Sequence, residues 1–273
     1  MRQQAKSFLR SYARYRPPEL DRRLDSLGRL TRRADDALFA VRDLTRYEQR
    51  VFSQNGEDGV LVEIFTRLGV TNQYFVEFGI QNGIEGNAVL LADVFGWSGL
   101  FFEADPKGFA EVSAKYAGSR VVVAQELVTA DRINRLLTEH DVPPEPDLLS
   151  IDIDGNDIYV WDALTDHRPR VVVIEYNSGI RGDGALAQPH DPDRVWDGSG
   201  AFGSTLAALD VVAARKGYRL AHSDLTGTNA FYVRTEDWEQ LGIDEAPRRT
   251  QNFGLTGITQ PPAEPPGGWR EVD

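Results

Sequence analysis

Tyr74-Phe-Val-Glu-Phe-Gly-Ile-Gln-Asn-Gly83 sets the architecture of this chain. Here a short apolar run leads into an acidic residue and then into two glycines. A second run of the same kind, Gly99-Leu-Phe-Phe-Glu-Ala-Asp105, ends in carboxylates about twenty residues further on. This arrangement is typical of the carboxyl end of a parallel sheet that holds a nucleotide or nucleoside, because glycines let the backbone approach the ligand and a carboxylate takes ribose hydroxyls.

Buried strands and amphipathic helices alternate regularly from residue 73 onward. Strands are predicted at residues 73 to 79, 99 to 104, 120 to 126, 147 to 153 and 170 to 176, with helices starting near Gly86, Lys107, Ala130 and Asp157. Continuous apolar runs at 121 to 124 and 171 to 174 predict strands that are covered on both faces. The pattern predicts an α/β fold with a doubly wound, mostly parallel sheet, to which late strands at 218 to 221 and 229 to 234 add an antiparallel edge hairpin.

Length and composition predict one main domain, because 273 residues with 41% hydrophobic content can bury a full core. We expect a helical arm over residues 1 to 50, a ligand-binding domain over 51 to 259, and a Pro/Gly-rich tail over 260 to 273 that lacks regular structure and forms a loose strap or is disordered. The absence of cysteine excludes disulfides, thiolate catalysis and Cys-ligated zinc. No apolar window is long enough for a membrane span or a secretion signal, so a cytoplasmic location is expected.

The net charge of −12 is unevenly distributed. Residues 1 to 50 hold 13 Lys and Arg against 7 Asp and Glu, so the remaining residues carry −18. A strongly acidic body argues against a nucleic acid partner, whose phosphates it would repel. The basic arm could contact nucleic acid or an anionic membrane surface, but its acids are interspersed with its bases, which favours a solvated helix that packs on the body or on another copy of the chain.

Carboxylates are densest where the fourth and fifth predicted strands end, in Asp152-Ile-Asp-Gly-Asn-Asp157 and Glu175-Tyr-Asn177. Neighbouring parallel strands end on the same side of a sheet, so these oxygens should converge there. Such a cluster needs a cation or a shared proton. Either Mg²⁺ binds to Asp154, Glu175 and Asn177, or Asp152 or Asp154 acts as a base that takes a hydroxyl proton. A purely structural alternative is that Asp154, Asn156 and Asp157 form the turn and cap of the next helix.

Two polar loops offer further candidates. His190 lies in a long loop over the predicted carboxyl edge, and its ordinary pKa suits base catalysis near neutrality. The alternative is a solvated loop histidine. In Ser53-Gln-Asn-Gly-Glu-Asp58, Ser53 is placed to cap a helix, whereas a functional interpretation turns Gln54, Glu57 or Asp58 toward the ligand.

The glycine spacing, Gly79-x-x-x-Gly83, differs from the Gly-x-Gly-x-x-Gly of dinucleotide-binding folds and points away from NAD. Residues 76 to 83 resemble motif I of class I S-adenosylmethionine-dependent methyltransferases. Five further segments resemble the FkbM-type family within that class: Ser53-Gln-Asn-Gly-Glu-Asp58, Asp147-Leu-Leu-Ser-Ile-Asp-Ile-Asp-Gly-Asn-Asp157, Val173-Ile-Glu-Tyr-Asn177, Phe202-Gly-Ser-Thr-Leu206 and Asn229-Ala-Phe-Tyr-Val-Arg234. The match covers residues 50 to 235.

The resemblance implies a seven-stranded Rossmann-like sheet whose last two strands form the late hairpin. It places the methionine part of the cofactor near Glu77 and the turn from Gly79 to Gly83, the ribose at Glu103, adenine near Gln125 or Glu126, and the methyl donor near Asp152. Gln81 stands where many members of the wider class have a glycine. The structural alternative for Glu103 is an exposed acid at a strand end.

The leading hypothesis is an S-adenosylmethionine-dependent O-methyltransferase that acts on a hydroxyl of a small molecule or glycan, with sugars and natural products as the acceptors that the resemblance suggests. A cofactor-binding module without turnover is the alternative from another class. An NAD-dependent oxidoreductase fits the sheet but not the glycine spacing.

Overall fold

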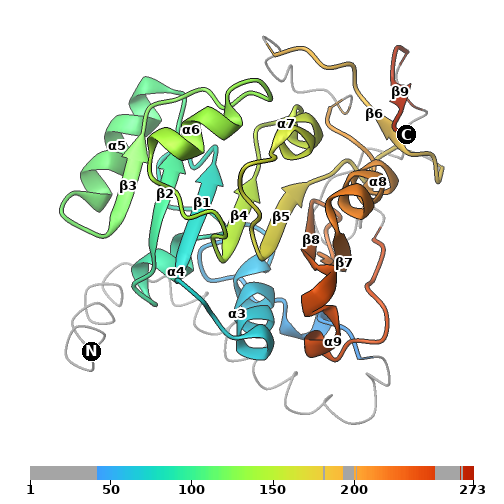
Figure 1. The fold of residues 1–273 in the computed structure, drawn as a ribbon, viewed down its shortest axis with the longest axis horizontal. Helices are drawn as coiled ribbons and strands as arrows, with labels where there is room; N and C mark the ends of the chain where they lie inside the picture. Colours follow the sequence, from blue (N-terminus) through green and yellow to red (C-terminus); the bar gives the residue numbers. More distant parts are fainter. Residues whose placement is uncertain (1–41, 181, 193–199, 201, 250–264, 266) are drawn as a thin grey trace, which may run out of the picture. The chain divides into compact units, whose positions relative to one another are not determined.

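The computed structural model describes residues 42–180, 182–192, 200, 202–249, 265 and 267–273 (Figure 1). The chain divides into compact units between Arg42 and Asp43, earlier than the boundary predicted at residue 50. The predicted helical arm up to residue 41, with its predicted contact to another copy of the chain, lies outside the described residues. Directly after the division, Leu44 is buried and a short 3-10 helix, η1 (Thr45–Tyr47), packs near the first helix of the main unit.

The main unit is built on one seven-stranded sheet (Figure 1). Five strands are parallel, and the two late strands run as an antiparallel hairpin beside the fifth, so the mostly parallel sheet of a class I methyltransferase-like Rossmann fold is confirmed. In sheet order the strands are β3 (Val121–Ala124), β2 (Ser98–Phe102), β1 (Tyr74–Phe78), β4 (Leu148–Ile151), β5 (Val171–Glu175), β8 (Asn229–Arg234) and β7 (Tyr218–Ser223).

Helices cover both faces of the sheet, which confirms the doubly wound arrangement. One face joins three helices in a single apolar core: α6 (Ile133–Glu139), α7 (Asp157–Ala163) and α8 (Leu206–Lys216). On the other face, Phe101 contacts both Phe75 and Tyr116, the last residue of α5. The remaining helices are α3 (Glu57–Leu68), α4 (Val89–Asp93), α5 (Pro106–Tyr116), η2 (Thr235–Asp237) and α9 (Trp238–Leu241).

The strand predictions agree with the structure to within two residues at each end of the five parallel strands. The prediction that both faces are covered holds for β5, where residues 171 to 174 are fully buried. It is wrong for β3, where Val122 is 52% exposed. β3 lies at the sheet edge with a neighbour on one side only, so its valine run reflects strand propensity rather than complete burial.

The prediction of a tail without regular structure is wrong for its last residues. β9 (Arg270–Glu271) pairs antiparallel with β6 (Leu186–Ala187) and forms a separate two-stranded sheet. The amide of Val272 also donates to the carbonyl of Ala185 at 2.8 Å. The end of the chain therefore straps the loop that follows β5, while residues 260–264 and 266 lie outside the described part.

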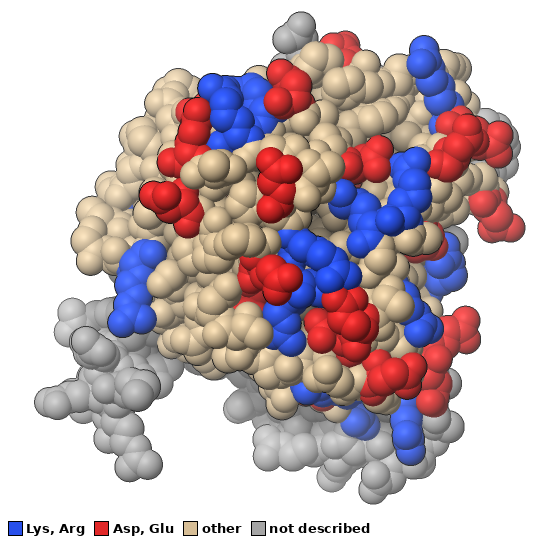
Figure 2. Space-filling model, viewed as in Figure 1, with Lys and Arg blue, Asp and Glu red and all other residues tan. Residues whose placement is uncertain are grey.

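Acidic and basic side chains are interspersed on the face of the molecule drawn in Figure 2, without a broad region of one sign. Ion pairs between the two kinds of side chain occur in the described part of the chain, such as Arg132 with Glu126 and Arg135 with Glu139. In the part of the chain that the structure describes, every helix is too short or too polar to cross a bilayer.

Candidate functional site

The turn after β1 is held between the ends of its two neighbouring strands. Gly79 has φ +72° and donates its amide to the carbonyl of Phe102 in β2. On the other side, a Cβ at Gly79 would lie 2.2 Å from the carbonyl oxygen of Asp152, which follows β4. Because β2 and β4 flank β1, Glu103 and Asp152 lie at the same sheet edge, on either side of this turn.

Gln81 and Gly83 also determine the backbone conformation of this turn. Gln81 adopts φ +54° at the position where a glycine is common in the wider class, so the left-handed conformation is kept without the glycine. Gly83 has φ +72°, and a Cβ there would lie 2.8 Å from Cγ2 of Val112 in α5. The lack of a side chain at Gly79 and Gly83 is thus explained by close packing of the protein itself, beyond the ligand approach that the sequence suggested.

Glu103 is tied to the glycine turn rather than exposed at a strand end. Its side chain is buried, and one carboxylate oxygen accepts the amide of Gln81 at 2.5 Å. The other oxygen accepts the amide of Asp105 at 2.8 Å. Each carboxylate oxygen has two lone pairs, so Glu103 retains the capacity to accept two ribose hydroxyls beside the turn.

Glu77 lies inside the protein and organises the loop that leads to α4. Its two oxygens accept the amides of Asn87 and Ala88 at 2.7 and 2.9 Å. Ser150 of β4 contacts the same carboxylate at 3.4 Å and accepts Nδ2 of Asn87 at 3.1 Å. Burial raises the pKa of Glu77 to about 7, although the two backbone amides act in the opposite direction. From its buried position, Glu77 therefore fixes the loop between β1 and α4 through these backbone amides.

The residues after β3 are placed at the same edge but differ in what they can offer. Gln125 is exposed, whereas Glu126 forms an ion pair with Arg132 at 2.5 Å. An adenine ring presents hydrogen-bond donors and acceptors rather than charge. The side-chain amide of Gln125 offers both a donor and an acceptor, and no described contact occupies either of them. Of the two predicted adenine contacts, Gln125 is the better placed.

Three carboxylates meet where β4 and β5 end. One oxygen each of Asp152, Asp154 and Glu175 lies within 4.8 Å of the others. Asp154 is exposed and has φ +57°, while Asp152 and Glu175 are partly buried. Burial raises the pKa of Asp152 and of Glu175 well above the ordinary value, and the charges of neighbouring acids, Asp157 among them, raise both further.

Asp157 belongs to the turn, as the structural alternative expected. Its two oxygens accept the amides of Ile153 and Gly155, both at 2.8 Å. Burial raises its pKa to about 6, and those two hydrogen bonds act in the opposite direction. Asp157 therefore fixes the loop that turns Asp154 toward Asp152 and Glu175.

The remaining predicted residues contact the long loop after β5. The side-chain amide of Asn177 donates to the carbonyls of Gly200 and Phe202, and its oxygen accepts the amide of Gly179. His190 is exposed, with its ring 4.8 Å from that of Tyr159 in α7. These contacts give neither residue a link to the three carboxylates, so a role of Asn177 as ligand and of His190 as base stays a prediction.

Sequence analysis missed Asn87, Ser150 and Asn229 as polar groups of the site. The side-chain amide of Asn229, the first residue of β8, donates to Glu57 at 2.8 Å. Glu57 is fully buried at the start of α3, where it also accepts the amide of Asn55. A polar residue inside an otherwise apolar strand, as at Ser150, is the sequence feature that could have identified such a group. A ligand-facing role of Gln54 or Glu57 stays a prediction, whereas Asp58 folds back to accept the amides of Val51, Phe52 and Ser53.

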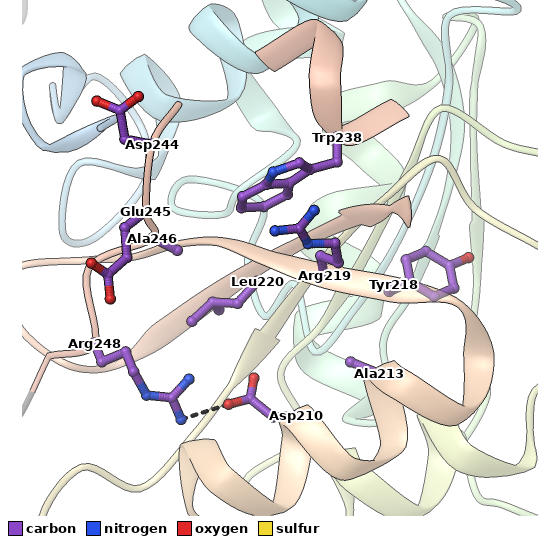
Figure 3. A pocket seen from close by; sticks show the side chains of 10 residues that line it. All are labelled: Asp210, Ala213, Tyr218, Arg219, Leu220, Trp238, Asp244, Glu245, Ala246 and Arg248. Carbon is purple, nitrogen blue, oxygen red and sulfur yellow. Dashed lines mark ion pairs between the residues drawn. The ribbon is translucent and has the colours of Figure 1, made fainter. Parts of the chain in front are cut away.

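A pocket of ≈ 330 Å³ lies elsewhere, along β7 between α8 and the segment after α9 (Figure 3). Arg248 pairs with Asp210 at 2.5 Å, and the guanidinium of Arg219 lies 3.9 Å from the centre of the Trp238 ring. None of the predicted site residues lines this pocket, so it does not bear on the chemistry at the carboxyl edge.

No family model and no curated protein matches the chain. Solved structures that resemble it include an S-adenosylmethionine-bound amino pentose methyltransferase from Micromonospora echinaspora, with 13% identity over 65% of this chain and 89% of that one and a TM-score of 0.42. A sugar N-methyltransferase from Streptoalloteichus has 15% identity, coverages of 76% and 92%, and a TM-score of 0.41. A ribosomal protein L11 methylase from Lactobacillus delbrueckii has 14% identity, coverages of 66% and 80%, and a TM-score of 0.40. At these low similarities we take function from the chain's own residues.

Proposed function

We propose that the chain is an S-adenosylmethionine-dependent methyltransferase that transfers a methyl group to a hydroxyl of a small molecule or glycan. The observation that carries this proposal is the position of the Gly79 turn between Glu103 and Asp152. At this sheet edge, Glu103 on one side of the turn can bind a ribose, and the acidic cluster around Asp152 on the other side can bind a cationic group.

The donor set of the edge fits this cofactor. Glu103 would take the ribose hydroxyls, Gln125 the adenine edge, and the turn from Gly79 to Gly83 the methionine part. The cofactor's sulfonium carries a positive charge, which the carboxylates of Asp152 and its neighbours complement. When bound, the cofactor supplies an electrophilic methyl group for in-line attack.

The protein's own contribution is to position the acceptor hydroxyl and to take its proton. Asp152 is the best-placed base, because it adjoins the glycine turn and lies in contact range of Asp154 and Glu175. Its raised pKa makes it a stronger base than an ordinary aspartate, and general bases act best with a pKa near the working pH.

As the alternative to a basic Asp152, the same three carboxylates suit a hard divalent cation such as Mg²⁺. Asp152, Asp154 and Glu175 repel one another, and a cation bound to one oxygen of each would offset that repulsion. Such an ion would orient vicinal hydroxyls of an acceptor, which fits the sugar and natural-product acceptors suggested by the resemblance to FkbM-type enzymes.

Calorimetric titration of the full chain with S-adenosylhomocysteine and, in parallel, with NAD tests the cofactor, each with and without Mg²⁺. We expect the homocysteine product to bind and NAD not to bind. Transfer of a labelled methyl group to a panel of hydroxylated sugars and natural products then tests turnover. Binding of NAD alone would refute the proposal, and product binding without turnover on any acceptor would favour a non-catalytic module.

A further inference from the structure

We infer that Asn229 is a fourth oxygen donor of the carboxylate cluster and that Glu57 holds it in the orientation required to bind a divalent cation there. This inference rests on the proposed function, since it adds to the cation site of Asp152, Asp154 and Glu175. It concerns a residue that lies more than fifty positions along the chain from Glu175 and that belongs to a different strand.

The strand register brings Asn229 to the cluster. Glu175 and Asn229 are directly opposite each other in the antiparallel pair of β5 and β8. The amide of Tyr176 donates to the carbonyl of Thr228 at 2.9 Å, which makes that neighbouring pair the hydrogen-bonded one. Glu175 and Asn229 are then a non-hydrogen-bonded pair, the kind in which the side chains lie closest together, on the same face of the sheet.

Both residues of this pair have an acceptor without a partner. Oε2 of Glu175 and Oδ1 of Asn229 are buried, and among the described residues neither has a hydrogen-bond donor. Asn229 is only 4% exposed, so bulk water does not supply one. Native proteins rarely leave such atoms unpaired, and two neighbouring acceptors satisfy each other only when one of them carries a proton. The pair therefore requires either a proton shared between its two oxygens or a bound group that is positively charged or donates a hydrogen bond, and the two further carboxylates beside it, Asp152 and Asp154, favour a cation.

Glu57 fixes which end of the Asn229 amide faces the cluster. A carboxylate only accepts hydrogen bonds, so the Nδ2 of Asn229 must point to Glu57, which it reaches at 2.8 Å, and Oδ1 must point away from it. Glu57 is itself immobilised, because it is fully buried and its other oxygen accepts the amide of Asn55 at 2.7 Å.

The donor set points to a hard divalent cation. Carboxylate and carboxamide oxygens are the ligands that Mg²⁺, Mn²⁺ and Ca²⁺ prefer. Asn229 contributes an oxygen without a further negative charge, so it adds a ligand without adding repulsion among Asp152, Asp154 and Glu175. Glu57 acts as a positioning residue behind this ligand, as hydrogen-bonded neighbours of metal ligands commonly do.

Mn²⁺ binding to the full-length, chelator-treated protein tests the inference, with the electron paramagnetic resonance signal of free Mn²⁺ as the readout. We expect the wild type to bind Mn²⁺ and Asn229→Ala to bind it about tenfold or more weakly. Glu57→Gln keeps the volume but lets the Asn229 amide turn round, so it should also weaken binding. Asn72→Ala is the matched control, because it removes an exposed amide at the opposite sheet edge, where Asn72 donates to the carbonyl of Glu145.

The double variant Glu57→Gln with Asn229→Asp is the sharpest arm, because it exchanges carboxylate and amide without changing charge or volume. The introduced amide can donate to one aspartate oxygen, and the other oxygen then faces the cluster. We expect Mn²⁺ affinity to recover to near the wild-type value in this variant. Recovery in the exchange variant would show that the loss in the Glu57→Gln variant depends on its pairing with Asn229.

The outcomes separate this inference from the proposed function. If the wild type and both single variants bind Mn²⁺ equally, Asn229 is not a ligand, while the cation site and methyl transfer stand. If the wild type binds no Mn²⁺, the cation site and the inference both fall. Titration with S-adenosylhomocysteine in the absence of metal still reports whether the cofactor site exists. A lack of Mn²⁺ binding is therefore not mistaken for failure of the methyltransferase assignment.

Discussion

Gly79 packs its Cα against the carbonyl oxygen of Asp152, at a distance that leaves no space for a Cβ. The contact joins the end of β1 to the end of β4 and sets the width of the site at the point where the cofactor and the acidic cluster are proposed to meet. Because the contact is to backbone, which cannot swing aside as a flexible side chain can, it should be intolerant of substitution.

Gly79→Ala should therefore destabilise the fold and abolish binding of S-adenosylhomocysteine. The added methyl would lie 2.2 Å from Asp152, and φ +72° is itself strained for alanine by about 1 kcal/mol. Gly242→Ala is the matched control, because Gly242 has a left-handed backbone with φ +58° but nothing near its missing Cβ. Urea unfolding should show a much larger loss of unfolding free energy at Gly79, and equal losses at the two positions would show that the turn can yield.

Glu103→Ala should weaken binding of S-adenosylhomocysteine by tenfold or more. The variant loses both the proposed ribose contacts and the hydrogen bond that holds Gln81 in the turn. Charge-assisted hydrogen bonds of this kind contribute about 1.5–3 kcal/mol. Calorimetry measures the affinity, and Glu111→Ala serves as control because Glu111 is half-exposed on α5, with only a distant Lys107 as partner. Unchanged affinity in Glu103→Ala would remove Glu103 from the cofactor site.

The arrangement of Glu103 and Asp152 could be predicted from the sequence because both follow strands whose apolar runs are local. Buried parallel strands have continuous apolar residues, and the rules for parallel sheets then place their carboxyl ends together. The glycine spacing likewise indicated a turn at Gly79 to Gly83, and in the structure both glycines have positive φ. What the sequence could not reveal is that close protein packing also requires these glycines.

Side-chain contacts across the antiparallel part of the sheet could not be predicted from the sequence. The position of Asn177 two residues after Glu175 in the sequence does not reveal that its side-chain amide donates to the carbonyl of Phe202 in the loop. Asn229 lies opposite Glu175 through strand pairing between distant segments, and register of that kind is set by tertiary packing rather than by a local pattern. The strand pairing of β9 with β6 could not be predicted for the same reason, because a two-residue strand has no measurable periodicity.

Stability should fall as pH rises from about 4.5 to 7. The pKa of Glu77 is about 7 in the folded protein against an ordinary 4.5, so over this range the folded state keeps a proton that the unfolded chain has lost. The stabilisation is complete below the unfolded pKa and is lost as pH rises through the folded one, to an extent of roughly 3 kcal/mol. Asp157 and Asp224, each with a pKa of about 6, act in the same direction.

Urea unfolding at pH 5 to 8 measures this slope, and Glu77→Gln should flatten it. That variant is less stable at every pH, because an amide cannot accept both of the backbone hydrogen bonds from Asn87 and Ala88. Only the change of slope therefore reports the titration. Glu111→Gln removes an exposed acid and should leave the slope as it is. A wild-type slope in Glu77→Gln would assign the titration to other groups.

Asp152→Asn should lower kcat by a factor of about 10² or more, the usual contribution of a general base, while binding of S-adenosylhomocysteine is retained. His190→Ala should change kcat little, because His190 is exposed and packs against Tyr159 on α7 rather than with the carboxylates. Initial rates on the best acceptor, taken across pH 6 to 9, distinguish the two. If Asp152 is the base, the pH–rate profile of Asp152→Asn should lose its acidic limb. If that limb persists in Asp152→Asn and His190→Ala loses most of its kcat, proton removal belongs to His190 in the loop after β5. The comparison is sharp because both substitutions leave Gly79 and Glu103 untouched, so an effect on kcat cannot be attributed to loss of the cofactor contacts.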